Sequence, residues 1–86
     1  MVISELAKTK ITKLLQQENA NLLKILLAGN AYVGFQTIIT FETTRPKEFI
    51  TITTEPLVVT DPRSYVQLAN SLLDFDSETN ELKFKM

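Results

Sequence analysis

The stretch AGNAYVGF, residues 28–35, contains the two glycines of the 86-residue sequence, Gly29 and Gly34. Glycine tolerates a positive φ and lets the backbone approach a ligand closely, so such a stretch is a candidate cradle for a phosphate or nucleotide. Tyr32, between the two glycines, has the amphipathic ring that often anchors a partner on an exposed loop. The sequence therefore predicts a candidate interaction loop made of Gly29, Asn30, Tyr32, Val33 and Gly34.

The same stretch also has a purely structural interpretation. The ring of Tyr32 would then pack over the apolar ends of neighbouring strands and bind nothing. In either case we expect Gly34 to meet a backbone requirement, which is a positive φ or close packing.

The acidic segment 74–81, DFDSETNE, places oxygen ligands at alternate positions, as a calcium loop does. It lacks the glycine at the sixth loop position and the closing glutamate of an EF-hand, so a solvated turn is favoured. Asp61 is expected to cap a helix. Ser64 and Ser71 have no histidine to activate them, so nucleophilic catalysis lacks a base. A carboxylate pair for acid–base chemistry stays open, but nothing in the sequence places two carboxylates together, and we expect no enzyme.

Composition excludes several classes of function. The sequence contains no cysteine and no histidine, which removes disulfides, thiolate nucleophiles and the usual borderline metal ligands, so we expect no metal and no cofactor. With a net charge of -1 and no basic run, the chain has no electrostatic footprint for nucleic acid or an anionic membrane. The start, MVISELAK, lacks the layout of a signal peptide, and no apolar run is long enough to span a membrane. We therefore expect a cytoplasmic protein.

The elements that position these residues follow from periodicity. Ser4 to Gln17 predicts an amphipathic helix capped by Ser4, with one apolar face made of Ala7, Ile11, Leu14 and Leu15. Residues 22–27 alternate with apolar side chains on both faces, and residues 35–42 alternate with one apolar face, so both predict strands.

The second half of the chain is predicted in the same way. A loop at residues 43–48 leads to strands at 49–54 and 57–60, separated by the turn Glu55-Pro56. Asp61 followed by Pro62 predicts a helix start, and we expect that helix to run to about Leu72. Its buried face is expected to contain Tyr65, Ala69 and Leu72, with Val66, Leu68 and Leu73 beside them. The tail holds an apolar stub around Phe75, the acidic turn, and an alternating finish at Leu82 and Phe84.

The order of these elements and several short motifs resemble the A-type iron–sulfur cluster carrier family, the HesB-like domain. The resemblance runs nearly ungapped from Ile3 to Lys85. It rests on these segments: ISELAKTKITKLLQQE at residues 3–18, LKILL at 23–27, ITF at 39–41, VVTDPRS at 58–64, LDF at 73–75 and FK at 84–85. It implies an α+β fold that is mostly β, namely a single HesB-like domain over residues 1–86. That fold is a β-sandwich of short mixed strands with an N-terminal amphipathic helix and a second short helix near residues 62–72.

The departures from the family concern its cluster ligands. The family's Gly-Cys-Ser-Gly loop falls on Ala31-Tyr32-Val33-Gly34, so Tyr32 takes the position of the first metal thiol. The family's Cys-Gly-Cys pair would lie just beyond Met86. Thiolate is the usual ligand of iron–sulfur clusters, and a neutral tyrosine with a pKa near ~10 is a poor substitute. The resemblance thus supports the fold and predicts a divergent member without the family's cluster chemistry.

Three functions remain open at this stage. The preferred one is a cluster-free HesB-like domain that acts by protein–protein contact, as a homodimer or with another protein. The second is an accessory subunit in iron–sulfur cluster biogenesis, whose partner supplies the cysteines. The third is a small-ligand binding module or enzyme that uses the loop around Tyr32, with a concavity near Asn30, Tyr32 and the Asp61 turn.

Overall fold

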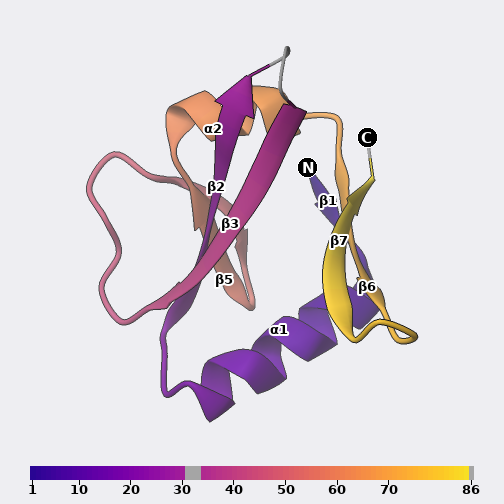
Figure 1. Ribbon diagram of the computed structural model, residues 1–86. Helices are drawn as coiled ribbons and strands as arrows, with labels where there is room; N and C mark the ends of the chain where they lie inside the picture. Colours follow the sequence, from indigo (N-terminus) through magenta and orange to yellow (C-terminus); the bar gives the residue numbers. More distant parts are fainter. Residues whose placement is uncertain (31–33, 86) are drawn as a thin grey trace.

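The computed structural model describes residues 1–30 and 34–85 (Figure 1). Two helices and seven strands are placed in that part of the chain. In chain order they are β1 (Val2–Ile3), α1 (Glu5–Gln17), β2 (Leu22–Asn30), β3 (Gly34–Glu42), β4 (Ile50–Thr54), β5 (Leu57–Thr60), α2 (Pro62–Leu68), β6 (Leu72–Asp76) and β7 (Glu81–Lys85).

Helix α1 begins where the sequence predicts it. The Ser4 hydroxyl accepts a hydrogen bond from the backbone N–H of Ala7 at 3.1 Å, which satisfies one of the free donors of the first turn. The helix ends before Asn19, which adopts a positive φ of 53°. Ala7, Ile11 and Leu15 are buried, as the apolar spacing predicts.

The strands form two sheets. The larger has the order β3-β2-β5-β4, and the smaller has the order β1-β6-β7. In the larger sheet β2 is antiparallel to β3 and parallel to β5, with Leu23 opposite Val58. Both faces of β2 are covered, because Leu23 and Ile25 on one face and Leu22 on the other are each at most 1% exposed. This confirms the prediction for residues 22–27, although the strand continues to Asn30.

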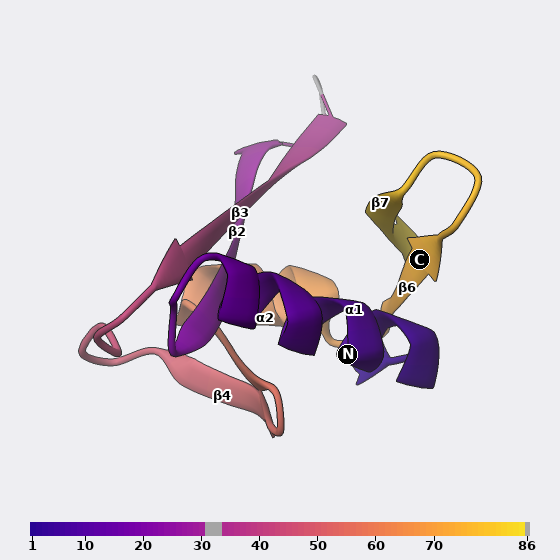
Figure 2. The same ribbon diagram turned by 90° about the horizontal axis from the view of Figure 1, so that it is seen from below.

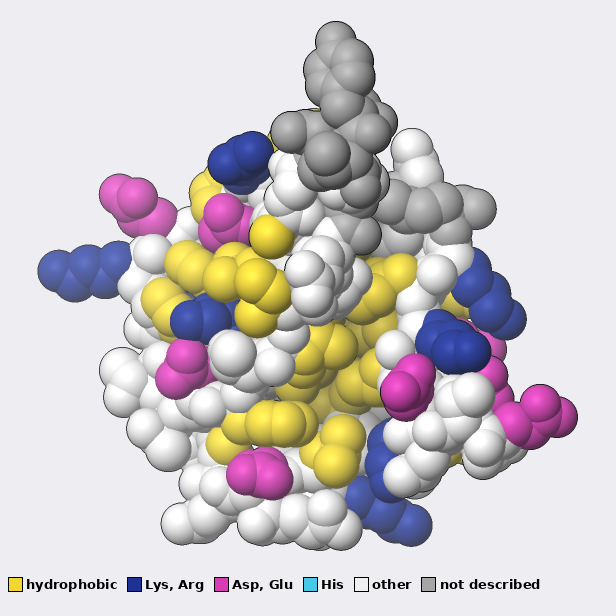
Figure 3. All heavy atoms as spheres, in the orientation of Figure 1, with side chains coloured by type: hydrophobic (Ala, Val, Ile, Leu, Met, Phe, Trp, Pro, Cys, Tyr) yellow, Lys and Arg dark blue, Asp and Glu magenta, His cyan; other side chains and the backbone are white. Residues whose placement is uncertain are grey.

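The core lies between α1 and the two sheets. Figures 1 and 2 show α1 running below both sheets, from the β6–β7 hairpin to the start of β2. Its buried residues pack with Ile25, Val58, Leu68 and Leu73. Further hydrophobic side chains pack against this core and stay half-exposed; among them are Leu27, Ile39, Phe41, Phe75, Leu82 and Phe84. Figure 3 shows hydrophobic side chains in a hollow between β3 and the β6–β7 hairpin.

The predicted second helix is partly wrong. Asp61 caps α2, and Pro62 is its first residue, as expected, but the helix ends at Leu68 and not near Leu72. The Ser71 backbone N–H and hydroxyl both donate to the Leu68 carbonyl, which closes the helix. The chain then enters β6.

The buried face predicted for that helix is right for Leu68 and Leu73, which are at most 1% exposed, and wrong for the residues expected at its centre. Tyr65 is 38% exposed and Ala69 is exposed, while Leu72 lies in β6 and pairs with Val2. Ser64 and Leu68 are the residues of α2 that are buried. The helical spacing of apolar residues continues past the end of α2 into β6. The pattern therefore predicts one longer helix where the structure has a helix followed by a strand.

Candidate functional site

The candidate interaction loop lies at the end of the β2–β3 hairpin. The two strands pair in register over nine residue pairs, from Leu22 opposite Glu42 to Asn30 opposite Gly34. Gly29 has φ 105° and Gly34 has φ 88°, which are angles that L residues rarely adopt. A Cβ added at Gly34 would meet no atom within 4 Å, so the requirement there is the backbone angle and not space. This confirms the first of the two reasons predicted for Gly34.

The five predicted loop residues are placed unequally. Gly29 and Asn30 belong to β2 and Gly34 opens β3, so most of the stretch AGNAYVGF is strand. Tyr32 and Val33 lie outside the described residues, and both readings of Tyr32 stay predictions. The structure thus describes the paired β2 and β3 residues up to Asn30 and Gly34.

Helix α2 supports this hairpin through Ser64. The Asp61 carboxylate accepts from the Ser64 backbone N–H at 3.0 Å, and the Ser64 hydroxyl oxygen accepts from the Leu27 backbone N–H at 2.9 Å. Ser64 is only 2% exposed. Thr60 adds a second tie, because its buried hydroxyl donates to the Ile25 carbonyl at 2.6 Å. These hydroxyls hold the hairpin to α2 and β5, and Ser64 is not placed as a nucleophile.

The acidic segment predicted as a solvated turn forms most of the β6–β7 hairpin. The Asp74 carboxylate accepts from the Ser4 hydroxyl at 2.6 Å and from the Phe75 backbone N–H at 2.8 Å, which lowers the pKa of Asp74. Lys83 lies 2.9 Å from Asp76, lowers the pKa of that carboxyl, and has its own pKa raised in return.

These carboxylates do not form a cation site. Each has a lysine beside it, since Lys85 lies 3.7 Å from Asp74. Within residues 1–30 and 34–85, no cluster of three metal-ligating side chains occurs. An iron–sulfur cluster needs thiolate or imidazole ligands, and the sequence contains neither cysteine nor histidine, so the donor set does not fit such a group.

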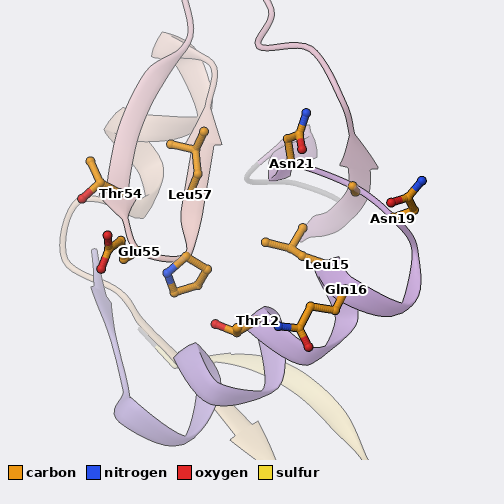
Figure 4. Close-up of a pocket in the computed structure, with 10 residues that line it drawn as sticks. Thr12, Leu15, Gln16, Asn19, Asn21, Thr54, Glu55 and Leu57 are labelled. Atoms are coloured by element: carbon orange, nitrogen blue, oxygen red, sulfur yellow. The ribbon is translucent and has the colours of Figure 1, made fainter.

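A cavity of about 810 Å³ opens at the other end of β2, between α1 and the β4–β5 turn (Figure 4). Thr12, Leu15 and Gln16 line it from α1, and Thr54, Glu55 and Leu57 line it from the opposite side. Asn19 and Asn21 complete its polar lining. Apart from Glu55 the lining side chains are uncharged, which suits a neutral polar ligand better than an ion.

This cavity is not among the sites that the sequence predicts. Thr12 and Gln16 had the spacing of a solvent-facing helix surface, and the polar stretch 17–21 was interpreted only as the end of that helix. The signal available was the group of four amide side chains at residues 16, 17, 19 and 21 beside Leu15. The concavity that had been expected would lie near the candidate loop, at the opposite end of β2.

Comparison with known proteins finds solved structures with a similar fold. No protein-family model and no curated protein matches the sequence. Among solved structures, the chain is similar to an NMR structure of a protein from Aquifex aeolicus, with a TM-score of 0.68 and 20% identity, covering 98% of this chain and 88% of that one. It is also similar to a crystal structure of IscA with the [2Fe-2S] cluster, with a TM-score of 0.76 and 11% identity, covering 98% of this chain and 82% of that one.

These likenesses concern the backbone. None of the helices in the described part of the chain is long and apolar enough to cross a membrane. The two mixed sheets, the N-terminal helix and the short second helix agree with the α+β sandwich predicted from the resemblance. The chain has an IscA-like fold.

Proposed function

We propose that this chain is a cluster-free IscA-like protein, a divergent relative of the A-type carriers, that works in the cytoplasm by protein–protein contact. In this role it is an accessory in iron–sulfur cluster biogenesis and catalyses no reaction. The observation that carries the proposal is the combination of an IscA-like backbone with a sequence that has no cysteine or histidine. Tyr32 stands at the position that the family resemblance gives to the first thiol.

The donor chemistry supports this reading. An iron–sulfur cluster is held by thiolates, with imidazole replacing some of them in certain centres. The carboxylates of Asp74 and Asp76 in the β6–β7 hairpin are engaged by Ser4, Lys83 and Lys85. A partner would therefore have to supply the ligands of any cluster that this chain handles.

Exposed hydrophobic surface supports a contact role. Ile39 and Phe41 on β3 and Leu82 and Phe84 on β7 are each only partly buried. Figure 3 shows hydrophobic side chains gathered in the hollow between these elements. Hydrophobic surface framed by polar and charged residues is typical of an interaction surface.

Reconstitution tests the proposal. The purified chain is incubated with iron and sulfide and is expected to stay colourless and free of bound iron. It is then mixed with a cysteine-bearing A-type carrier that holds a cluster, and the lifetime and transfer rate of that cluster are measured. Substantial iron and sulfide in the isolated chain would overturn the cluster-free role, and an unchanged carrier would overturn the accessory role.

The two tyrosines provide a matched pair of variants. If the loop at Tyr32 is the contact, Tyr32→Ala is expected to abolish the effect on the carrier. Tyr65→Ala, on the exposed side of α2, is expected to leave it unchanged. Equal loss in both variants would speak against a contact made by the loop.

A second candidate is small-ligand binding, and the cavity between α1 and the β4–β5 turn favours it. Its volume of about 810 Å³ lies within the usual range of roughly 300–1,000 Å³ for ligand pockets. A screen of neutral polar molecules by NMR is expected to shift the side-chain amides of Gln16 and Asn21 if this candidate holds. No shift in these amides across the screen would exclude the cavity as the binding site.

A further inference from the structure

The four edges of the two sheets differ in how they are protected against pairing with another strand. An unpaired edge exposes backbone N–H and C=O groups, and proteins usually blunt it by shortness, charge, proline or a bulge. Strand β1 has two residues, β4 has a register shift between Thr51 and Thr53, and β7 carries Lys83 and Lys85 within five residues. Each of these three edges has at least one of the usual protections.

Strand β3 has none of them. It is nine residues long, GFQTIITFE, with no lysine, arginine or proline, and its pairing with β2 is regular along its whole length. Its one charged residue, Glu42, lies at the end and is neutralised by Lys24 at 2.9 Å. Figures 1 and 2 show no described helix or strand over its outer edge. In the described part of the chain, β3 pairs only with β2.

We propose that the outer edge of β3 pairs antiparallel with β3 of a second copy of this chain. The inference rests on the proposed contact role and names one partner for it. The midpoint of strand 34–42 is Ile38, so pairing over the full strand places Ile38 opposite its own copy at a twofold axis. Two four-stranded sheets then join into one continuous sheet, a known mode of strand addition.

Side-chain chemistry in this register is complementary. Ile38, which is 41% exposed, gains an apolar cross-strand partner. Glu42 lies opposite Gly34 of the second copy, so like charges do not meet. Thr37 lies opposite Ile39, which places two β-branched side chains together on the face of the hollow.

Thr40 adds an independent observation. Its buried hydroxyl oxygen has no hydrogen-bond partner among the described residues, and such a group is rare in a native structure. In the twofold register, Thr40 lies opposite the exposed Gln36 of the second copy, on the same face of the joined sheet. Pairing thus adds an amide side chain beside Thr40, whose hydroxyl oxygen is already covered within one copy.

A charge exchange at Ile38 tests the pairing. The mass in solution of the purified chain is measured by light scattering over a concentration series, and a dimer of twice 9.8 kDa is expected to form as concentration rises. Ile38→Lys and Ile38→Glu each place like charges opposite each other and are expected to weaken the dimer at least about tenfold. An equal mixture of the two variants is expected to restore it. Val66→Lys, at a residue 71% exposed on α2, is the control and is expected to dimerise like the parent.

Each outcome decides the proposal. A parent chain that stays monomeric at the highest soluble concentration overturns it, and so does an Ile38→Lys variant that dimerises normally. Failure of the mixture to restore the dimer also overturns it, because the two side chains then do not lie opposite each other. The experiment with the cluster-bearing carrier tests the proposed function separately. A monomeric Ile38→Lys variant that still alters the carrier would keep the accessory role and show that pairing is not needed for it.

Discussion

The two hairpins of this protein are fastened in different ways. The β6–β7 hairpin has five residue pairs and is laced by the ion pairs Lys83–Asp76 and Lys85–Asp74. The β2–β3 hairpin has nine pairs and one ion pair, Lys24–Glu42. The short hairpin thus uses charge both to hold its strands and to protect its edge. The long one depends on packing against α2 and the core, and its edge strand β3 carries no lysine or arginine.

The largest expected effect on stability comes from shortening one buried core residue in each hairpin. Leu23 of β2 and Leu73 of β6 are both 0% exposed and belong to one core. Leu23→Ala and Leu73→Ala are each expected to lower the free energy of unfolding by about 2–5 kcal/mol, since each leaves a cavity. Urea denaturation followed by circular dichroism measures the loss, and Leu6→Ala, at an exposed position, is the control. A small loss at Leu73 alone would mean that the short hairpin is held mainly by its charges.

Substitutions at the positive-φ residues of the two hairpins are expected to have a smaller effect on stability. Gly34 has φ 88° in open space, and Asn80 has φ 60° in the β6–β7 turn. Gly34→Ala is expected to cost about 1–2 kcal/mol of stability, because an L residue is strained at that angle. Asn80→Ala is expected to cost less than about 1 kcal/mol, since an L residue already occupies that position. Both values come from the same denaturation experiment. A neutral Gly34→Ala variant would contradict the backbone requirement.

The smallest expected difference between the two hairpins lies in how their stability depends on pH. The pKa values of Asp74 and Asp76 lie below their ordinary value of 3.8, so their stabilisation is complete above that pH and is lost as pH falls through the lowered values. The pKa of Lys83 lies above 10.5, so its stabilisation is complete below that pH and is lost as pH rises through the raised value. The β6–β7 hairpin is therefore expected to loosen at both extremes.

NMR shifts of the Leu82 and Phe84 side chains, followed against pH, measure this loosening, with Ile25 of β2 as the internal reference. Asp76→Asn is the control and is expected to flatten the part of the acid response that comes from the Lys83 pair. Equal movement of Ile25 and Phe84 would show global unfolding and remove the distinction between the hairpins.

Much of the fold was predictable because local signals agreed with the tertiary structure. Ser4 and Asp61 cap helices where the sequence predicts caps. The alternation at residues 35–42 and the short apolar run at residues 57–60 predict strands that the structure has. The resemblance to the A-type carriers supplied the arrangement of these elements, which periodicity alone does not.

The failures have physical causes. Leu68, Leu72 and Leu73 have helical spacing, but Ser71 closes α2 and β6 takes the last two into pairing with β1 and β7. Val2 and Ile3 form a strand only because β6 lies beside them, and two residues carry no pattern of their own. The cavity by Gln16 arises from the approach of the β4–β5 turn, which is a long-range contact. Of the candidate site, the positive φ of Gly34 was predictable and confirmed, and Tyr32 stays a prediction.

The parallel pairing of β1 with β6 has a consequence for protein synthesis. It brings Val2 opposite Leu72 and Ile3 opposite Leu73, and Ser4 also binds Asp74. A ribosome makes α1 well before β6, against which the apolar face of that helix packs. Contacts between such distant residues form slowly, because a long loop must close first. The packing of α1 is therefore complete only after β6 has emerged, although β2 can contact the helix earlier.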